Sequence, residues 1–189
     1  MESKQLFDKY NEGRHWEKHP IIYAERFVNF LKKQNFRGLL VDIGCGNGRD
    51  VNFFQQHGLK AIGIDYSDKE IKISKDNYPE CEFEVQNAEE LKFKDKSVDA
   101  FYMINVIHYL RKDKALQEAY RALKNNGYFF IHFNISIIDK EGHVDYRHQE
   151  SDILNLVSDF QIVEKRIFER HDTIPKDHTH KIMELILKK

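Results

Sequence analysis

The feature that most constrains this chain is residues 39–50, which read Leu-Leu-Val-Asp-Ile-Gly-Cys-Gly-Asn-Gly-Arg-Asp. The first half is an apolar run with one acid, which is typical of a strand buried on both faces of a parallel sheet. Glycine then takes every second position, at Gly44, Gly46 and Gly48, before a helical pattern resumes. Glycine lets a ligand approach the backbone closely, and a helix N-terminus offers unpaired N–H groups. The stretch therefore predicts a strand, a tight turn and a helix start that bind an anionic or acceptor-rich ligand.

The spacing of the glycines narrows the class of ligand. A dinucleotide fingerprint would need its third glycine at Arg49, so the close helix–strand packing of that motif is not encoded. The pattern is instead Asp-x-Gly-x-Gly-x-Gly from Asp42, with Asp65 closing the next predicted strand. It resembles the first two motifs of the class I S-adenosylmethionine-dependent methyltransferases. The resemblance implies that the glycine turn holds the methionine part of S-adenosyl-L-methionine and that Asp65 accepts hydrogen bonds from both ribose hydroxyls, as a carboxylate can.

The same resemblance extends to the adenine of the cofactor. Tyr66 follows the acid and is placed to lay its ring near the purine. Asn87 stands where the family commonly has an acid, so its carbonyl oxygen would accept the adenine amino proton more weakly, and the backbone N–H of Ala88 would reach the ring. The expected cofactor-binding residues are Asp42, Gly44, Cys45, Gly46, Gly48, Asp65, Tyr66, Asn87, Ala88 and Asn105.

The acceptor side is expected at residues 105–109, because open α/β sheets place ligands beyond the carboxyl ends of their strands. His108 has an ordinary pKa near neutrality, which makes it the first candidate for deprotonating or orienting a methyl acceptor. The alternative is a histidine fixed by a backbone hydrogen bond without a chemical role. By resemblance, the segment before the first strand forms part of a lid over the cofactor. The candidate substrate-contacting residues are Tyr10, Trp16, Tyr109, His143 and Tyr146.

Alternating strand and helix patterns predict a single α/β domain over residues 1–189, with an N-terminal helical cap (1–37) and a core (38–189). The family resemblance implies a Rossmann-like three-layer sandwich: a seven-stranded, mostly parallel sheet with one antiparallel strand, and helices on both faces. Ser67 and Glu70 form a capping-box signature for a helix start. Asn125-Asn126-Gly127 predicts a left-handed helix cap, and residues 134–150 are polar enough to predict a loop beside the crevice.

Composition limits the partners. Thirty basic and 31 acidic residues give a formal net charge of -1, and the basic ones are scattered, so no nucleic-acid partner is expected. Cys45 and Cys81 have neither metal-ligand spacing nor the number for a disulfide framework, which fits a reducing compartment. The first 20 residues are charged and no segment could span a membrane, so we expect a cytoplasmic protein.

His178 and His180 would point the same way from a strand start, but no third metal ligand can be identified from the sequence, so no metal is predicted. We therefore expect an enzyme, a methyltransferase that uses S-adenosyl-L-methionine to methylate a small-molecule acceptor, with an oligomeric state that the sequence leaves open. One alternative is an S-adenosylmethionine-binding regulatory or interaction module without transfer activity. A nicotinamide-dependent oxidoreductase is disfavoured by Arg49.

Overall fold

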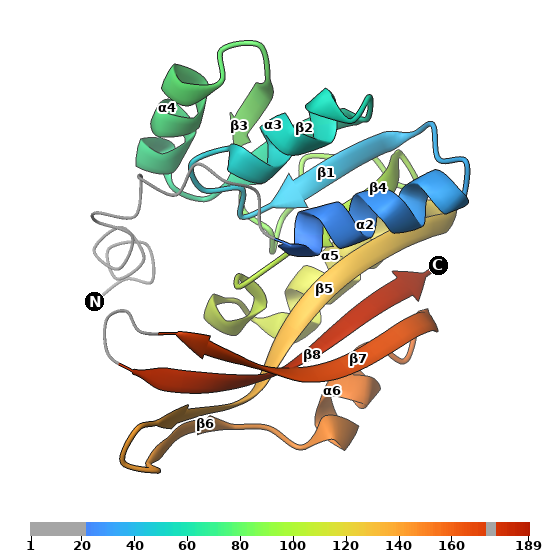
Figure 1. The fold of residues 1–189 in the computed structure, drawn as a ribbon. Helices are drawn as coiled ribbons and strands as arrows, with labels where there is room; N and C mark the ends of the chain where they lie inside the picture. Colours follow the sequence, from blue (N-terminus) through green and yellow to red (C-terminus); the bar gives the residue numbers. More distant parts are fainter. Residues whose placement is uncertain (1–21, 173–176) are drawn as a thin grey trace.

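A computed structural model describes residues 22–172 and 177–189. Seven strands form one sheet in the order β3-β2-β1-β4-β5-β8-β7, and β8 runs antiparallel to both of its neighbours (Figure 1). The predicted sheet, with its single antiparallel strand inserted near the edge, is confirmed. An eighth short strand pairs with the far end of β5. The strands are β1 (Leu39–Ile43), β2 (Lys60–Asp65), β3 (Glu82–Val85), β4 (Val98–Met103), β5 (Leu123–Asp139), β6 (Val144–Arg147), β7 (Gln161–Asp172) and β8 (His178–Lys188).

Helices cover both faces of the sheet, as predicted. Two clusters of buried side chains mark the two faces: one includes residues of α2, α3 and α4, and the other residues of α5 and α6. None of the helices in the described part of the chain is long and apolar enough to cross a membrane. Their bounds are α2 (Ile22–Lys33), α3 (Arg49–Gln56), α4 (Asp68–Asn77), the 3-10 helix η1 (Ile107–Tyr109), α5 (Lys112–Ala122) and α6 (Glu150–Leu156).

The second half of the chain corrects two expectations. The predicted loop 134–150 is mostly strand: β5 continues to Asp139 and returns through a turn into β6. β5 extends this far because β8 pairs with it as far as Asp139↔His178. The predicted helix cap at residues 125–127 is also wrong. α5 ends at Ala122 because Leu123 already has strand geometry and pairs with Val98 of β4.

Helix α2 is fastened to the sheet by a buried ion pair. Arg26 Nε lies 2.6 Å from Glu184 Oε1 of β8, and Glu184 Oε2 lies 3.0 Å from His132 Nε2 of β5. Glu184 and His132 are each 1% exposed, so the carboxylate is compensated from two sides inside the fold. His132 is thereby a packed histidine between the sheet and α2.

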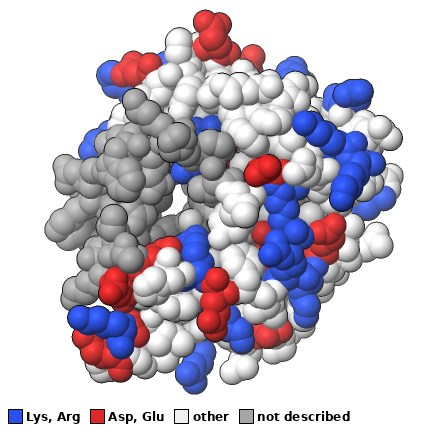
Figure 2. All heavy atoms as spheres, viewed as in Figure 1, with Lys and Arg blue, Asp and Glu red and all other residues white. Residues whose placement is uncertain are grey.

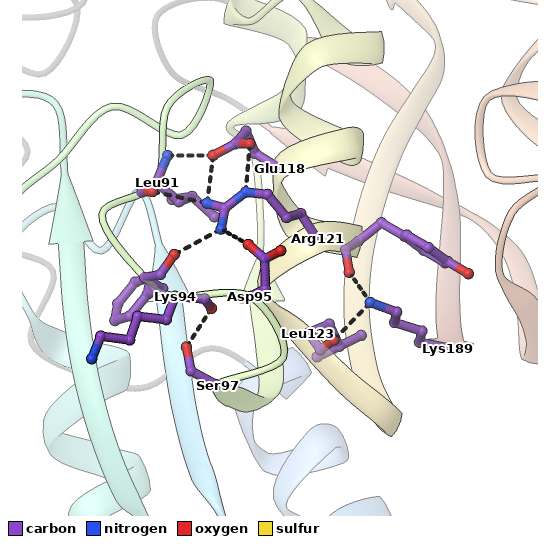
Figure 3. Close-up of polar contacts among 10 residues, drawn as sticks. Leu91, Lys94, Asp95, Ser97, Glu118, Arg121, Leu123 and Lys189 are labelled. Atoms are coloured by element: carbon purple, nitrogen blue, oxygen red, sulfur yellow. Dashed lines mark hydrogen bonds and ion pairs between the residues drawn. The ribbon is translucent and has the colours of Figure 1, made fainter.

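Arg121 of α5 positions the segment that follows β3 (Figure 3). Its guanidinium donates to Glu118 (2.8 Å), Asp95 (2.7 Å) and the backbone oxygen of Leu91 (3.0 Å), while Leu91 N–H donates to Glu118 Oε2 (2.9 Å). The planar, five-donor guanidinium is suited to this role. The segment fixed in this way begins with Asn87, a predicted adenine contact.

Candidate cofactor and acceptor site

The carboxyl ends of the central parallel strands meet at one edge of the sheet. Asp42 of β1 pairs with Gly63 of β2 and with Tyr102 of β4, so these three strands end at the same level. In Figure 1 the arrowhead of β1 points to this edge. The edge holds the glycine turn (44–48) after β1, Asp65 at the end of β2, and Asn105 after β4. The structure thus brings the two predicted cofactor motifs together.

The glycine turn is a compact backbone structure. Gly44 N–H and Cys45 N–H both donate to the Ile64 carbonyl, at 2.8 and 3.0 Å, which fastens the turn to β2. Gly46 and Gly48 have φ values of 51° and 83°, in the left-handed region that favours glycine. A side chain on Gly48 would also meet the Phe83 ring at 2.6 Å, so this glycine is needed for packing.

Asp65 joins the turn to the start of α4. Its Oδ2 accepts from Gly46 N–H at 3.0 Å, and its Oδ1 accepts from Ser67 N–H at 2.9 Å. Ser67 then caps α4 by accepting from Glu70 N–H at 3.3 Å, which confirms the predicted helix start. These two bonds fix the Asp65 side chain between the glycine turn and the start of α4.

Beneath the turn lies a buried acidic group. Asp42 is 4% exposed and Asp50 is 7% exposed. Arg49 Nε donates to Asp50 Oδ1 at 2.8 Å, and the hydroxyl of Tyr102 donates to Asp50 Oδ2 at 3.4 Å. Burial, with repulsion from Asp50, raises the pKa of Asp42 well above its ordinary value, although Arg49 opposes the shift. Asp50 and Tyr102 were not predicted as site residues, because their positions show no motif and only the fold brings them under the turn.

The raised pKa of Asp42 predicts a stabilising substitution. A carboxyl whose pKa is raised on folding stabilises the folded state while it is protonated. This contribution to the unfolding free energy is lost as the pH rises through the folded-state pKa. Asp42→Asn removes the ionisation, so we expect a gain of about 0.5–2 kcal/mol in unfolding free energy at pH 7. The gain should shrink toward zero below about pH 4, where the carboxyl is neutral in both states.

Urea unfolding of both proteins between pH 4 and pH 8 measures this difference. The exposed Asp76→Asn serves as the control, and its effect should not depend on pH in this way. An Asp42→Asn protein that is less stable than the wild type at pH 7 would show that the ionised carboxylate stabilises the fold.

The predicted adenine contacts lie beside the same edge. Tyr66 directly follows Asp65 and is 48% exposed, so its ring is accessible to a planar ligand. Asn87 follows β3, and its Oδ1 accepts from Glu89 N–H at 2.9 Å. A carbonyl oxygen has two lone pairs, so this bond orients the amide and still permits a second donor. Ala88 is 7% exposed.

Cys45 lies inside the glycine turn and is 8% exposed. Burial raises the pKa of its thiol well above the ordinary value, with nearby Asp42 and Asp65 adding to the effect. The side chain stays a thiol at neutral pH, so its part in the site is to pack.

On the acceptor side, Asn105 follows β4 with a φ of 59°, an uncommon conformation for a residue other than glycine. His108 lies in η1, and Tyr109 beside it is 43% exposed. Burial lowers the pKa of His108 to about 3, and the nearby Lys112 and three other histidines add to the shift. The expectation that His108 titrates near neutrality is therefore corrected: the imidazole is neutral at pH 7.

The other histidines that act on His108 are His180, His148 and His132. Burial also lowers the pKa of His180, to about 4. His148 joins this region because its N–H donates to the Ile135 carbonyl at 2.7 Å, which ties the chain after β6 to β5. These histidines thus lie near enough to lower the pKa of His108, which sequence spacing alone could not show.

Of the remaining candidate substrate residues, His143 is the one whose side chain the structure describes, and it is not at this edge. His143 lies in the turn between β5 and β6, where its Nδ1 is 2.9 Å from Asp139 and its side chain is 74% exposed. Figure 1 shows this hairpin extending away from the β1 turn. Tyr10 and Trp16 lie outside the described residues, and so does the side chain of Tyr146.

The best-defined hollow among the described residues lies at the opposite edge of the sheet and measures about 640 Å³. Its polar groups pair with one another: Asp99 accepts from Lys124 at 2.8 Å and from Leu39 N–H at 2.9 Å. Ligands of open α/β sheets bind at the carboxyl edge, so we assign this hollow no part in the site.

A parallel sheet of this order, with a glycine turn after β1 and an acid after β2, defines a Rossmann-like fold with a nucleoside-binding edge. Residues 41–131 match the family described as "Methyltransferase domain". This matched part of the chain is a class I S-adenosylmethionine-dependent methyltransferase domain, as the sequence predicted, and the family implies S-adenosyl-L-methionine as methyl donor.

Two curated relatives share this part of the chain. The human "Probable tRNA methyltransferase 9B" is 32% identical over 111 residues, which cover 57% of this chain and 24% of that protein. The mouse "tRNA (carboxymethyluridine(34)-5-O)-methyltransferase ALKBH8" is 30% identical over 159 residues, covering 82% of this chain and 22% of that protein. The matched regions are thus less than a quarter of either relative.

Among solved structures, the magnesium protoporphyrin IX methyltransferase from Synechocystis PCC 6803, determined with bound SAM, is similar over nearly its whole length. The TM-score is 0.67, with 98% of this chain and 97% of that chain covered, at 18% sequence identity. At this identity the likeness shows a shared fold.

Proposed function

We propose that this chain transfers the methyl group of S-adenosyl-L-methionine to a small-molecule acceptor. The observation that carries the proposal is the junction at Asp65, whose carboxylate bonds both Gly46 N–H and Ser67 N–H at the common end of β1 and β2. Asp65 would hold the ribose, the turn at residues 44–48 the methionine part, and Tyr66 with Asn87 the adenine.

Methyl transfer from this cofactor requires little chemical assistance from the side chains of the protein. The sulfonium of the bound cofactor supplies an already activated methyl group, so the chain has to hold an acceptor lone pair in line with the methyl–sulfur bond. Orientation of this kind can contribute about 7–11 kcal/mol. Neutral His108 can orient an acceptor by hydrogen bonding, whereas a pKa of about 3 makes it a weak base at pH 7.

The charge distribution supports a small acceptor. Net charge is -1, and Figure 2 shows acidic and basic side chains together on the viewed face. The larger group of basic side chains is on the right of this view, whereas β1 points to the left in the matching view of Figure 1.

Transfer RNA is the second candidate acceptor, and the 30–32% identity to the two tRNA methyltransferases favours it. The test combines calorimetric titration with S-adenosylmethionine and S-adenosylhomocysteine and transfer of labelled methyl to two cell fractions, desalted small molecules and total tRNA. Label in the small-molecule fraction supports the proposal, and label in tRNA alone overturns it. Binding without transfer to either fraction identifies a binding module instead.

The role of His108 gives a separate prediction. On the acceptor that the screen identifies, we expect His108→Ala to lower kcat about 10–100-fold, because a misplaced acceptor can cost up to that much. His108→Gln should recover part of this loss through its side-chain hydrogen bonds.

Neither His108 substitution should change the shape of the pH profile between pH 6 and pH 9, because the imidazole does not titrate in this range. His57→Ala, which removes an exposed histidine from the end of α3, is the matched control and should keep full turnover. A step near pH 6.5 that disappears in His108→Gln would instead identify His108 as a titrating base.

A further inference from the structure

Three side chains lie close together where β7 ends and β8 begins. Asp172 of β7 lies directly opposite His178 of β8, and His180 follows two residues later on the same face of the strand. His180 Nε2 is 3.3 Å from Asp172 Oδ2, and His178 Nε2 is 3.9 Å from the same oxygen. One potential ligand atom from each side chain lies within 4.8 Å of the other two.

The contact of His180 with Asn134 indicates which nitrogen of the neutral ring carries the proton. The other nitrogen, which faces Asp172, then carries a lone pair. His180 Nδ1 lies 3.2 Å from Asn134 Oδ1, an acceptor, so in the neutral ring the proton is on Nδ1. Nε2 then presents a lone pair to a carboxylate oxygen only 3.3 Å away. In this tautomer two acceptors face each other, and a cation bound between them would remove their repulsion.

Arg170 does not supply that charge to the imidazoles. Its guanidinium donates to both oxygens of Asp172, with Nη2 2.7 Å from Oδ2 and Nε 3.0 Å from Oδ1. This pair fixes the carboxylate, as second-shell hydrogen bonds do for ligating carboxylates. Arg170 therefore bonds the carboxylate, whereas His180 Nε2 approaches its Oδ2 from β8.

We propose that Asp172, His178 and His180 bind one divalent transition-metal ion of the zinc type. With metal–ligand bonds of about 2.0–2.2 Å, tetrahedral ligands lie about 3.4 Å apart, close to the two distances found here. Two imidazoles and one carboxylate suit such an ion, and Asn134 supplies the usual second-shell partner of a ligating histidine. The side chains of the three residues are 11–31% exposed, so solvent can reach a fourth coordination position.

A second group on the same sheet provides the control. Asp139, Glu141 and His143 also come within ligand distance of one another, but in a single exposed turn. There Asp139 already accepts from the backbone N–H groups of Glu141 and His143, at 3.0 and 2.8 Å. These bonds account for the arrangement of the turn without an ion.

The experiment is a titration of the full chain with Zn²⁺ against a chromophoric chelator, after treatment with EDTA. We expect one equivalent to bind, with affinity reduced more than about 100-fold in His178→Ala and His180→Ala and about 10–100-fold in Asn134→Ala. His143→Ala should bind as the wild type does. Binding that persists in both ligand variants, or no binding by the wild type at micromolar protein, overturns the proposal.

Thermal unfolding separates loss of the site from loss of the fold. In EDTA, the His178→Ala and His180→Ala proteins should melt close to the wild type, and only the wild type and His143→Ala should gain thermal stability on adding Zn²⁺. Absorption of the Co²⁺-loaded protein tests the donor set, because thiolate charge-transfer bands would place the ion on a cysteine, Cys45 or Cys81, and contradict the assignment. These readouts do not depend on methyl transfer.

Discussion

Asp65→Ala should abolish tight binding of S-adenosylmethionine and S-adenosylhomocysteine. A hydrogen bond to a charged group contributes about 1.5–3 kcal/mol, and two ribose hydroxyls would each lose one. Every 1.4 kcal/mol is about tenfold in affinity, so the dissociation constant should rise at least about 100-fold. The loss should be compounded because Gly46 N–H and Ser67 N–H also lose their acceptor.

Calorimetric titration of the purified variant measures the effect directly. Asp76→Ala is the matched control, since it removes a carboxylate from the exposed face of α4, where Asp76 pairs only with Lys72 at 2.6 Å among the described contacts. Thermal unfolding without ligand shows whether each variant is folded. If folded Asp65→Ala binds the cofactor as tightly as the wild type, the ribose is held elsewhere and the assignment of the second motif fails.

Local signals were sufficient to predict the glycine turn after β1 and an acid at the end of β2. The apolar run before Gly44 and the acid at the end of the next strand can each be recognised from a few neighbouring residues. Parallel pairing of β1 with β2 places both at one edge of the sheet. The capping signature at Ser67 was likewise local and is confirmed. Signals of this kind persist into the fold because backbone geometry at a turn or helix start depends mainly on the residues that form it.

The acceptor half depended on contacts between distant segments, which the sequence does not display. The polar character of residues 134–150 indicated a loop, yet residues 134–139 form strand because β8 pairs with them. The pKa of His108 follows from burial among residues that are distant in sequence. The approach of Asp172 to His180 depends on the register of β7 against β8, which cannot be determined from the spacing of two histidines.

The second large effect is expected at Gly46, where a methyl group should block the cofactor while leaving the fold nearly intact. A Cβ at Gly46 would meet only Glu70 Oε2, at 4.0 Å, among the described residues. Packing against the described residues therefore does not require glycine there, in contrast to Gly48. A ligand close to the Gly46 backbone would meet the added methyl, and overpacking of about 1–3 kcal/mol should weaken S-adenosylhomocysteine binding about 10–100-fold.

Gly58→Ala separates this steric effect from backbone strain. Gly58 also has a positive φ, of 78°, and a Cβ there would meet nothing within 4 Å, but it lies at the far end of α3 from the turn. Both substitutions should cost about 1–2 kcal/mol of stability, because a left-handed conformation is unfavourable for alanine. Only Gly46→Ala should lose the thermal stabilisation by S-adenosylhomocysteine. Equal behaviour of the two variants would mean that Gly46 serves the turn alone, and that the cofactor does not approach its backbone.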